Sequence, residues 1–373
     1  MKKRIISIIL AFAVVLGLVP TVMAEGGTSV SRAYSATRSL LSRQKGTYQW
    51  ANGNVNADDW CAFALARDGI SIPQSYIDSV EKFTPTAKSS VSECARAILL
   101  LTACGEEVRD ALLTAVTAKD NFAYSGDVIY ALLALDSKNY TVPTGGMSHE
   151  ELIKLLLNLQ QEDHAWGYSY YDTDMWKTPY GTDVDTTAEA ITALTPYYSD
   201  AKVKTAVDNA LLYLKSQQNA DGTFGYGGSA SVESTAQVIV ALTSLEIDPT
   251  DWNGKNMVKA MCTMAETSGG FLNYENKYDE YSTANGYYAL VAYERFKAHK
   301  TALYDMTDVN AGGEKGCCLL RSILAVVPAL NAVISAIADK IPTRNGMTIG
   351  SLIYGILSVG ALLSVRYIGN MYN

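Results

Sequence analysis

The feature that most constrains this chain is an internal repeat. A Thr-Ala pair recurs at an interval of 48 residues, at Thr187-Ala188, Thr235-Ala236 and Thr283-Ala284. Each is followed six residues later by an Ala-Leu pair, at Ala193-Leu194, Ala241-Leu242 and Ala289-Leu290. Weaker copies of this apolar segment end at Ala64-Leu65, Leu100-Leu101 and Ala134-Leu135, so six copies recur at intervals of 36, 34, 59, 48 and 48 residues. Because repeated units bury their apolar faces against neighbours, we expect one continuous array rather than several separate domains.

Two kinds of helix alternate along this array. The six copies are apolar and contain small residues, as in Thr-Ala-Gln-Val-Ile-Val-Ala-Leu from Thr235, which is typical of a helix packed on several sides. Between them lie amphipathic segments with charges on one face, at residues 34–43, 74–83, 107–117, 149–161, 201–217 and 254–265. The alternation predicts an all-α fold. We expect a closed α/α toroid of six inner and six outer helices, with an open helical solenoid as the alternative.

The loops carry a second signature. Residues 214–225 read Leu-Lys-Ser-Gln-Gln-Asn-Ala-Asp-Gly-Thr-Phe-Gly, residues 157–167 read Leu-Asn-Leu-Gln-Gln-Glu-Asp-His-Ala-Trp-Gly, and Ser268-Gly-Gly-Phe271 is a degenerate copy. A Gln at the end of an outer helix, a glycine turn, an aromatic residue and then Asp/Glu-x-Thr-Ala resemble the prenyltransferase and squalene-cyclase repeat over residues 29–298. This resemblance implies an α/α toroid. It does not single out a function, because protein prenyltransferases, class II terpenoid cyclases, thioester domains and cobalamin carriers share that architecture.

Both ends of the chain are expected to lie outside the toroid. Residues 1–24 combine three cations near the start with an uncharged stretch and a Val-Met-Ala ending, which predicts a signal peptide. The toroid is expected at 25–298 and a linker at 299–321. Residues 322–368 contain uncharged runs at 322–338 and 345–365, which predict a membrane-anchoring region of one or two spans. We therefore expect an exported protein, anchored by its C-terminus at the extracytoplasmic face of the cell membrane.

Charge and residue types exclude several functions. The chain has 38 acidic and 30 basic side chains and a net charge of −8, which argues against nucleic acid as a partner. Its three histidines do not lie at the starts of the inner helices, so we expect no metal site of the protein-prenyltransferase kind. The segment Cys104-Gly105-Glu106-Glu107 lacks the glutamine of a thioester motif. Cys61 and Cys94 are a candidate disulfide pair, and no cofactor is evident.

One acidic motif suggests catalysis. The segment Asp183-Val184-Asp185-Thr186 resembles the Asp-x-Asp-Asp motif of class II terpenoid cyclases, but it departs at Thr186. The resemblance implies that Asp185, with Asp183 beside it, donates a proton to an alkene; a carboxyl near a second carboxylate and aromatic rings has a raised pKa. The alternative is ordinary helix capping, because acids lie near the start of every inner helix, at Asp58, Glu93, Asp127, Asp185, Glu233 and Glu280.

The same acids suggest a binding site. If the inner helices are parallel, their starts form one acidic mouth of the ring, entered by loops rich in aromatic residues. The candidate ligand-binding residues are Trp166, Tyr168, Tyr170, Trp176, Phe224, Tyr226, Glu233, Phe271 and Tyr274. Such a mouth suits a cationic, sugar-like or corrinoid ligand, and the resemblance to cobalamin carriers implies a cobalamin-like ligand as one candidate. The alternative is that the loop aromatics only pack against the preceding helix.

We therefore expect a membrane-tethered toroid that binds a small molecule, glycan or peptide at its mouth without catalysis. The alternative is a class II cyclase-like enzyme that uses Asp185. A third reading is a glycan-active toroid, in which paired carboxylates act beside the stacking platforms Trp166 and Trp176; its candidate acids are Asp172, Asp174, Asp183 and Asp185.

Overall fold

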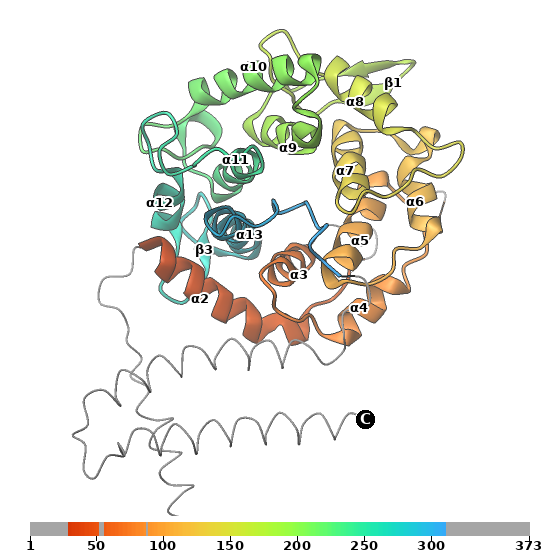
Figure 1. The fold of residues 1–373 in the computed structure, drawn as a ribbon. Helices are drawn as coiled ribbons and strands as arrows, with labels where there is room; N and C mark the ends of the chain where they lie inside the picture. The colour runs from red at the N-terminus through yellow and green to blue at the C-terminus, as the bar shows by residue number, and fades with distance from the viewer. Residues whose placement is uncertain (1–28, 52–55, 87–88, 311–373) are drawn as a thin grey trace, which may run out of the picture. The chain divides into compact units, whose positions relative to one another are not determined.

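The computed structural model describes residues 29–51, 56–86 and 89–310, which form a ring of helices (Figure 1). The inner helices are α3 (Ala57–Arg67), α5 (Val91–Cys104), α7 (Ser125–Asp136), α9 (Val184–Leu194), α11 (Val232–Ser244) and α13 (Glu280–Lys297). The outer helices are α2 (Ser29–Gln44), α4 (Gln74–Glu81), α6 (Asp110–Thr117), α8 (His149–Asn158), α10 (Ala201–Gln217) and α12 (Met257–Met261). The fold is the α/α toroid that the sequence predicts.

Short elements complete the ring at its loops. Two small antiparallel hairpins pair β1 (Tyr170–Asp172) with β2 (Met175–Lys177) and β3 (Phe271–Leu272) with β4 (Tyr278–Asp279). The 3-10 helices are η1 (Lys45–Thr47), η2 (Lys119–Asn121), η3 (Thr195–Tyr197), η4 (Tyr226–Gly228) and η5 (Cys262–Met264). All these elements connect one inner or outer helix to the next, so they shape the two faces of the ring.

The ring closes between its first and last inner helices. α13 packs directly against α3, and Arg295 Nη1 donates to the backbone oxygen of Arg67 over 3.0 Å. The Tyr287 hydroxyl of α13 donates to Asp68, the residue that follows α3, over 2.7 Å. These contacts join segments more than 200 residues apart. The closed toroid is therefore right, and the open solenoid is wrong.

The threonine of each Thr-Ala pair joins a loop to an inner helix. Thr187, Thr235 and Thr283 accept hydrogen bonds from the backbone amides of Trp166, Phe224 and Phe271, over 3.0, 3.0 and 2.9 Å. Each threonine hydroxyl also donates to a backbone oxygen four residues earlier, that of Asp183, Ser231 or Asp279. The three aromatic side chains are fully buried in the core. This arrangement explains why the aromatic residue and the Thr-Ala pair recur together.

Glycine follows two of these aromatics because the chain is crowded there. A Cβ on Gly167 would lie 2.0 Å from the backbone oxygen of Gly181, and one on Gly225 would lie 2.0 Å from that of Ser229. Any side chain at either position would force the loop away from the inner helix that follows it. The glycines of the loop signature thus permit close approach of two backbone segments.

Residues 299–310, here named the strap, cross the ring at the carboxyl ends of the inner helices (Figure 1, blue). Leu303 and Met306 are buried, and the Met306 amide donates to the backbone oxygen of Ser137 over 2.7 Å. Asp308 accepts from Arg67 over 2.9 Å and from Arg295 over 2.7 Å. The described part of the expected linker therefore belongs to the toroid, which extends at least to residue 310 instead of ending at 298.

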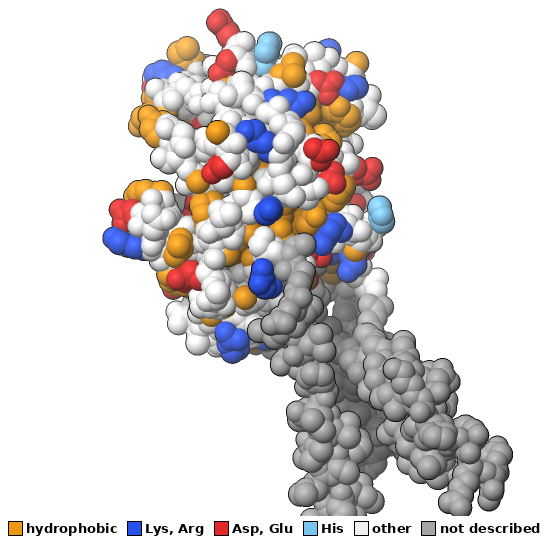
Figure 2. Space-filling model, turned by 90° about the vertical axis from the view of Figure 1, so that its left-hand side faces the viewer, with side chains coloured by type: hydrophobic (Ala, Val, Ile, Leu, Met, Phe, Trp, Pro, Cys, Tyr) orange, Lys and Arg blue, Asp and Glu red, His pale blue; other side chains and the backbone are white. Residues whose placement is uncertain are grey.

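The expected signal peptide at 1–24 and the membrane-anchoring region at 322–368 lie outside the described residues. Among the residues that are described, no helix is long and apolar enough to span a membrane. On the side of the ring shown in Figure 2, basic and acidic side chains are interspersed with hydrophobic ones. That side shows no continuous field of one charge sign that would mark a binding surface for a polyion.

Candidate functional site

Most inner helices are capped by residues other than the acids expected to do so. The side chains of Asn56, Ser90, Asp183, Ser231 and Asp279 cap α3, α5, α9, α11 and α13. Asp127 does serve its own helix, since its carboxylate accepts from the amides of Ala123 and Tyr124. On α9 the cap is Asp183, whose Oδ1 accepts from the Thr186 amide over 2.7 Å. Asp185 is thereby left without a capping role.

The Asp185 carboxyl lies inside the ring in an unusual state. Its Oδ1 atom is buried and has no hydrogen-bond partner among the described residues. The pKa of Asp185 is raised to about 6, mainly by burial and also by the carboxylates of Asp183 and Glu233, while a hydrogen bond from Ser234 opposes this rise. A buried carboxyl oxygen without a partner is costly, so its retention points to a ligand or a reaction.

Glu189 lies one helical turn further along α9 and faces the same way as Asp185. Oε1 of Glu189 accepts a hydrogen bond from the Tyr130 hydroxyl over 2.9 Å. The pKa of Glu189 is raised to about 8, mainly by burial and also by the carboxylates of Asp185 and Asp183, while the hydrogen bond from Tyr130 opposes this rise. Glu189 therefore keeps its proton at neutral pH, whereas Asp185 is mostly ionised.

Aromatic rings surround this pair of carboxyls. Trp60 contacts Tyr130 with ring centroids 5.8 Å apart and Tyr288 at 6.5 Å, and Tyr288 contacts Tyr304 of the strap at 6.1 Å. Trp60, Tyr130 and Glu189 are half-buried although they lie on inner helices. They therefore border space inside the ring, where an aromatic wall can stabilise a positive charge.

A large cavity lies next to these residues, toward the carboxyl ends of the inner helices. Its volume is about 1180 Å³, and it is lined by the ends of α7, α9, α11 and α13 together with the strap. Leu133, Thr192 and Ala292 line it one turn beyond Tyr130, Glu189 and Tyr288 on the same helices. Tyr304 lines the cavity and also contacts Tyr288, so its ring connects the wall of the cavity to the aromatic cluster.

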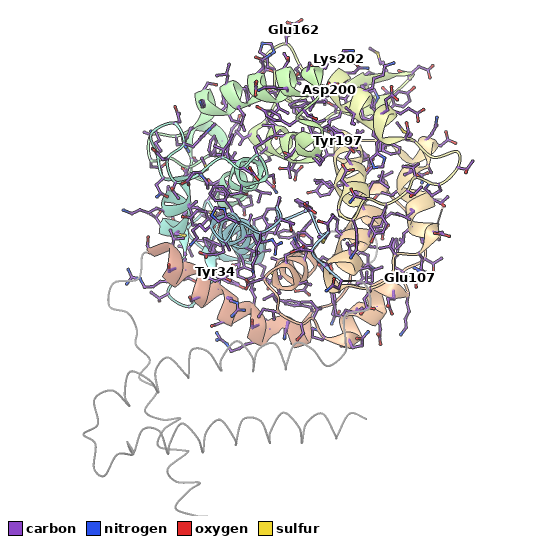
Figure 3. The ribbon with its side chains drawn as sticks, in the orientation of Figure 1. Tyr34, Glu107, Glu162, Tyr197, Asp200 and Lys202 are labelled. Carbon is purple, nitrogen blue, oxygen red and sulfur yellow. The ribbon has the colours of Figure 1, made fainter. Side chains whose placement is uncertain are left out.

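A second polar cluster lies on the wall of this cavity. Asp136 at the end of α7 accepts from the Tyr197 hydroxyl over 2.7 Å and lies 3.2 Å from Nε2 of His149. Figure 3 labels Tyr197 beside the end of α9, where its side chain reaches toward α7. These contacts join α7, α8 and α9, and we assign the cluster no chemistry beyond that.

The ligand-binding residues expected from the sequence fall into a buried group and a group that is exposed or half-buried. Trp166, Phe224 and Phe271 are buried in the core, as the packing alternative describes, and Trp166 Nε1 donates to the Leu156 backbone oxygen. Tyr168, Tyr226 and Tyr274 are exposed, and Tyr170 and Trp176 lie half-buried on the β1–β2 hairpin. Glu233 is half-buried and accepts hydrogen bonds from Ser231 and Ser282.

Sequence reasoning missed Glu189 and the tyrosines around it. A signal was present, because a polar residue follows each Thr-Ala pair inside an otherwise apolar helix: Glu189, Gln237 and Asn285. Gln237 accepts from the Tyr288 hydroxyl over 3.0 Å, so two of the three join the same interior network. No group of three or more potential metal ligands occurs in the ranges that the structure describes, and Cys61 and Cys94 have free thiols.

Comparison with known proteins gives matches among solved structures only. No protein-family model and no curated protein matches the chain. It is similar to ent-copalyl diphosphate synthase from Streptomyces platensis, at 18% identity and a TM-score of 0.45, over 63% of this chain and 50% of the synthase. It is also similar to the type II terpene cyclase MstE from Scytonema, at 11% identity and a TM-score of 0.46, over 72% of this chain and 99% of MstE. The chain thus spans about half the length of the synthase.

Proposed function

We propose that the toroid is an enzyme of the class II terpenoid cyclase type, which protonates an alkene inside its ring. The observation that carries this proposal is Glu189, a carboxylic acid whose pKa is raised to about 8 and which accepts a hydrogen bond from Tyr130, a member of a cluster of aromatic rings. The unpaired Oδ1 of Asp185 supports it, because a purely structural carboxyl would be expected to have a partner.

Each residue has a definite part in the proposed step. The O–H bond of Glu189 breaks and the alkene's π electrons form a new C–H bond, which leaves a positive charge on the more substituted carbon. The faces of Trp60, Tyr288 and Tyr304 stabilise that charge, and the Tyr130 hydroxyl donates to the carboxylate left on Glu189. Water then accepts a proton from the cyclised cation, which ends the reaction, and the hydronium ion formed returns a proton to the Glu189 carboxylate.

The assignment of the proton differs from that implied by the sequence motif. With a pKa of about 6, Asp185 is mostly ionised at neutral pH, so we assign the transferred proton to Glu189. The negative charge of Asp185 favours the neutral form of its neighbour. Asp183 remains the cap of α9, and its substitution is expected to affect stability more than the proton transfer.

Product analysis tests this function. The full-length protein is incubated with linear isoprenoid alcohols and diphosphates of increasing length, and cyclic products are measured by gas chromatography with mass spectrometry. We expect a cyclic product that Glu189→Gln abolishes and Asp185→Asn reduces, with deuterium incorporated when the reaction runs in D₂O. Glu280→Gln is the matched control, since Glu280 also opens an inner helix but is exposed. Absence of any product, or a product unaffected by Glu189→Gln, would overturn the proposal.

Ligand binding without catalysis is the second candidate. It is favoured by the exposed rings of Tyr226 and Tyr274, which are 97% and 76% exposed in the loops that precede α11 and α13. A thermal-shift panel of corrinoids, glycans and cell-wall peptides tests it, because a ligand that binds only the folded state raises the unfolding temperature. If no compound stabilises the protein, or Tyr226→Ala leaves every shift unchanged, this candidate fails.

We further propose export and membrane anchoring, on the basis of residues 1–24 and 322–368. The charged start, apolar stretch and small residues of the first segment support export, and the two uncharged runs of the second support anchoring. Fractionation of expressing cells should place the chain in the membrane, with the toroid cleaved by protease added outside. A soluble protein, or a toroid protected in intact cells, would contradict this localisation.

A further inference from the structure

One loop of the toroid is longer than the corresponding loop of the next repeat. The loop between α8 and α9 covers residues 159–183, whereas the corresponding loop between α10 and α11 covers only 218–231. The additional residues account for the long interval of 59 in the repeat, and they contain the β1–β2 hairpin. Because α9 and α11 are joined to their loops in the same way, the hairpin is not required for that joint.

The hairpin has regular antiparallel pairing between its two strands. Tyr171 of β1 lies opposite Trp176 of β2, and their ring centroids are 5.7 Å apart. The turn between the strands contains Thr173 and Asp174, both with positive φ, as tight hairpin turns require. Tyr170 also bridges to Tyr124, the residue before α7, so the hairpin is fixed to the neighbouring repeat.

Exposed aromatic rings gather beside the hairpin. Tyr124 contacts Tyr168 with ring centroids 5.5 Å apart, and Tyr168 contacts Tyr180 at 6.2 Å. These three residues, here named the tyrosine strip, are 45%, 43% and 82% exposed. With Tyr171 and Met175 of the hairpin they make up five of the ten large hydrophobic side chains exposed in the described part of the chain. A cluster of exposed hydrophobic side chains of this kind is typical of a surface that contacts a partner.

The surroundings of the strip are acidic. Residues 162–183 contain the five carboxylates Glu162, Asp163, Asp172, Asp174 and Asp183, and the single lysine Lys177. Asp172 already binds the Lys177 ammonium over 2.5 Å, so that cation is neutralised locally. Asp174 is exposed at the tip of the hairpin, and Glu162, labelled in Figure 3, is exposed in the loop before it. The loop that carries the hairpin thus combines an excess of acidic residues with open tyrosine rings.

We propose that the tyrosine strip and the β1–β2 hairpin form a docking surface for a lysine- or arginine-rich segment of a partner protein. Tyrosine faces attract cations through their quadrupole, and the nearby carboxylates add charge complementarity. The tyrosines contact one another, so little side-chain freedom is lost when a partner binds. A neutral glycan would use the rings but not the carboxylates, and an acidic partner would be repelled.

Peptide binding to the full-length protein tests this proposal independently of any cyclase activity. The probes are fluorescent peptides of alternating lysine and serine, or of alternating glutamate and serine, and a neutral chitin oligosaccharide. We expect the lysine peptide to bind and the glutamate peptide not to bind, and we expect the affinity to fall as salt is added. Tyr180→Ala should weaken lysine-peptide binding at least fivefold, whereas Tyr180→Phe, which keeps the ring, should retain it.

Two matched controls separate this surface from general effects. Leu212→Ala removes another exposed apolar side chain, on α10, and Glu107→Gln removes a carboxylate that Figure 3 places far from Glu162. Both controls should bind the lysine peptide like the unmodified protein, while Asp174→Asn should bind it more weakly. Equal loss in the controls, equal binding of the two peptides, or preference for the oligosaccharide would overturn the proposal.

Discussion

The Tyr130 hydroxyl of α7 donates a hydrogen bond over 2.9 Å to Oε1 of Glu189 on the neighbouring inner helix α9. The contact fixes one oxygen of a carboxyl that burial and two nearby carboxylates keep protonated. The contact engages only Oε1, so we assign the transferable proton to the other oxygen, Oε2. Tyr130 thus positions Glu189 and stabilises the carboxylate that remains after transfer.

Removal of this hydroxyl is expected to destabilise the ring and weaken the acid. Tyr130→Phe leaves Oε1 of Glu189 without its donor, which should lower the free energy of unfolding by about 1 to 3 kcal/mol. Because the hydrogen bond lowers the pKa of Glu189, its loss should raise that pKa further. Urea unfolding measures the first effect. Tyr226→Phe, at a fully exposed ring, is the control and should change nothing; equal stability of both variants would show that the bond is unimportant.

Stability should fall as the pH rises through the titration of Glu189. Its pKa in the folded protein is about 8, above its usual value of 4.5, so between these values the folded state binds more protons than the unfolded state. The free energy of unfolding is therefore expected to decrease from pH 5 to pH 8.5, by roughly 4 kcal/mol from this group. Asp185 acts in the same direction, up to a pKa of about 6. In Glu189→Gln the decrease should be much smaller, and an unchanged pH profile would contradict the assignment.

The ring itself was predictable from the repeat, because buried and amphipathic segments alternate visibly along the chain. The expected outer segments at 74–83, 107–117 and 201–217 contain α4, α6 and α10, and the Thr-Ala pairs lie inside α9, α11 and α13. The strap was not predictable, since it is short and has no helical periodicity. Its place depends on Asp308 meeting two arginines from helices at opposite ends of the sequence.

The candidate site was only half predictable for a similar reason. The motif around Asp185 stood out by its resemblance to a known pattern, whereas Glu189 is a single polar residue in an apolar helix. Its altered pKa depends on Tyr130 and on burial by helices far away in the chain. For the loop aromatics the sequence left two readings open, and burial favours packing for Trp166, Phe224 and Phe271.

Asp308 should hold the strap in place. Arg67 and Arg295 are nearly fully buried, and both donate to the Asp308 carboxylate, so Asp308→Ala leaves two buried guanidinium groups with fewer acceptors. Since the arginines keep backbone acceptors such as Leu303, we expect a loss of about 2 kcal/mol in unfolding free energy and faster proteolysis within the strap. Asp305→Ala is the control, because the Asp305 carboxylate bonds to Thr307 and has only a Coulombic interaction with Arg67, without a side-chain hydrogen bond to either arginine. Proteolysis at the same rate in both variants would contradict this role.

The repeat threonines should contribute to stability through the loops they anchor. Thr235→Val keeps the volume of the side chain but leaves the buried amide of Phe224 without an acceptor, at an expected cost of about 1 to 3 kcal/mol. Thr205→Val, on the exposed face of α10, should cost far less. Chemical unfolding of the two variants measures both losses in the free energy of unfolding. Similar losses for the two variants would mean that the repeated threonine hydrogen bond does not hold the loops in place.

The most direct test of the central claim is infrared titration of Glu189, comparing the full-length protein with its Glu189→Gln variant. We predict that at pH 7 the difference spectrum contains the carbonyl band of a neutral carboxylic acid, and that this band disappears with a midpoint near pH 8. The variant lacks the group, so the band belongs to Glu189 alone. If the difference spectrum at pH 7 contains only carboxylate bands, Glu189 is ionised at that pH, and the proposed acid catalysis is wrong.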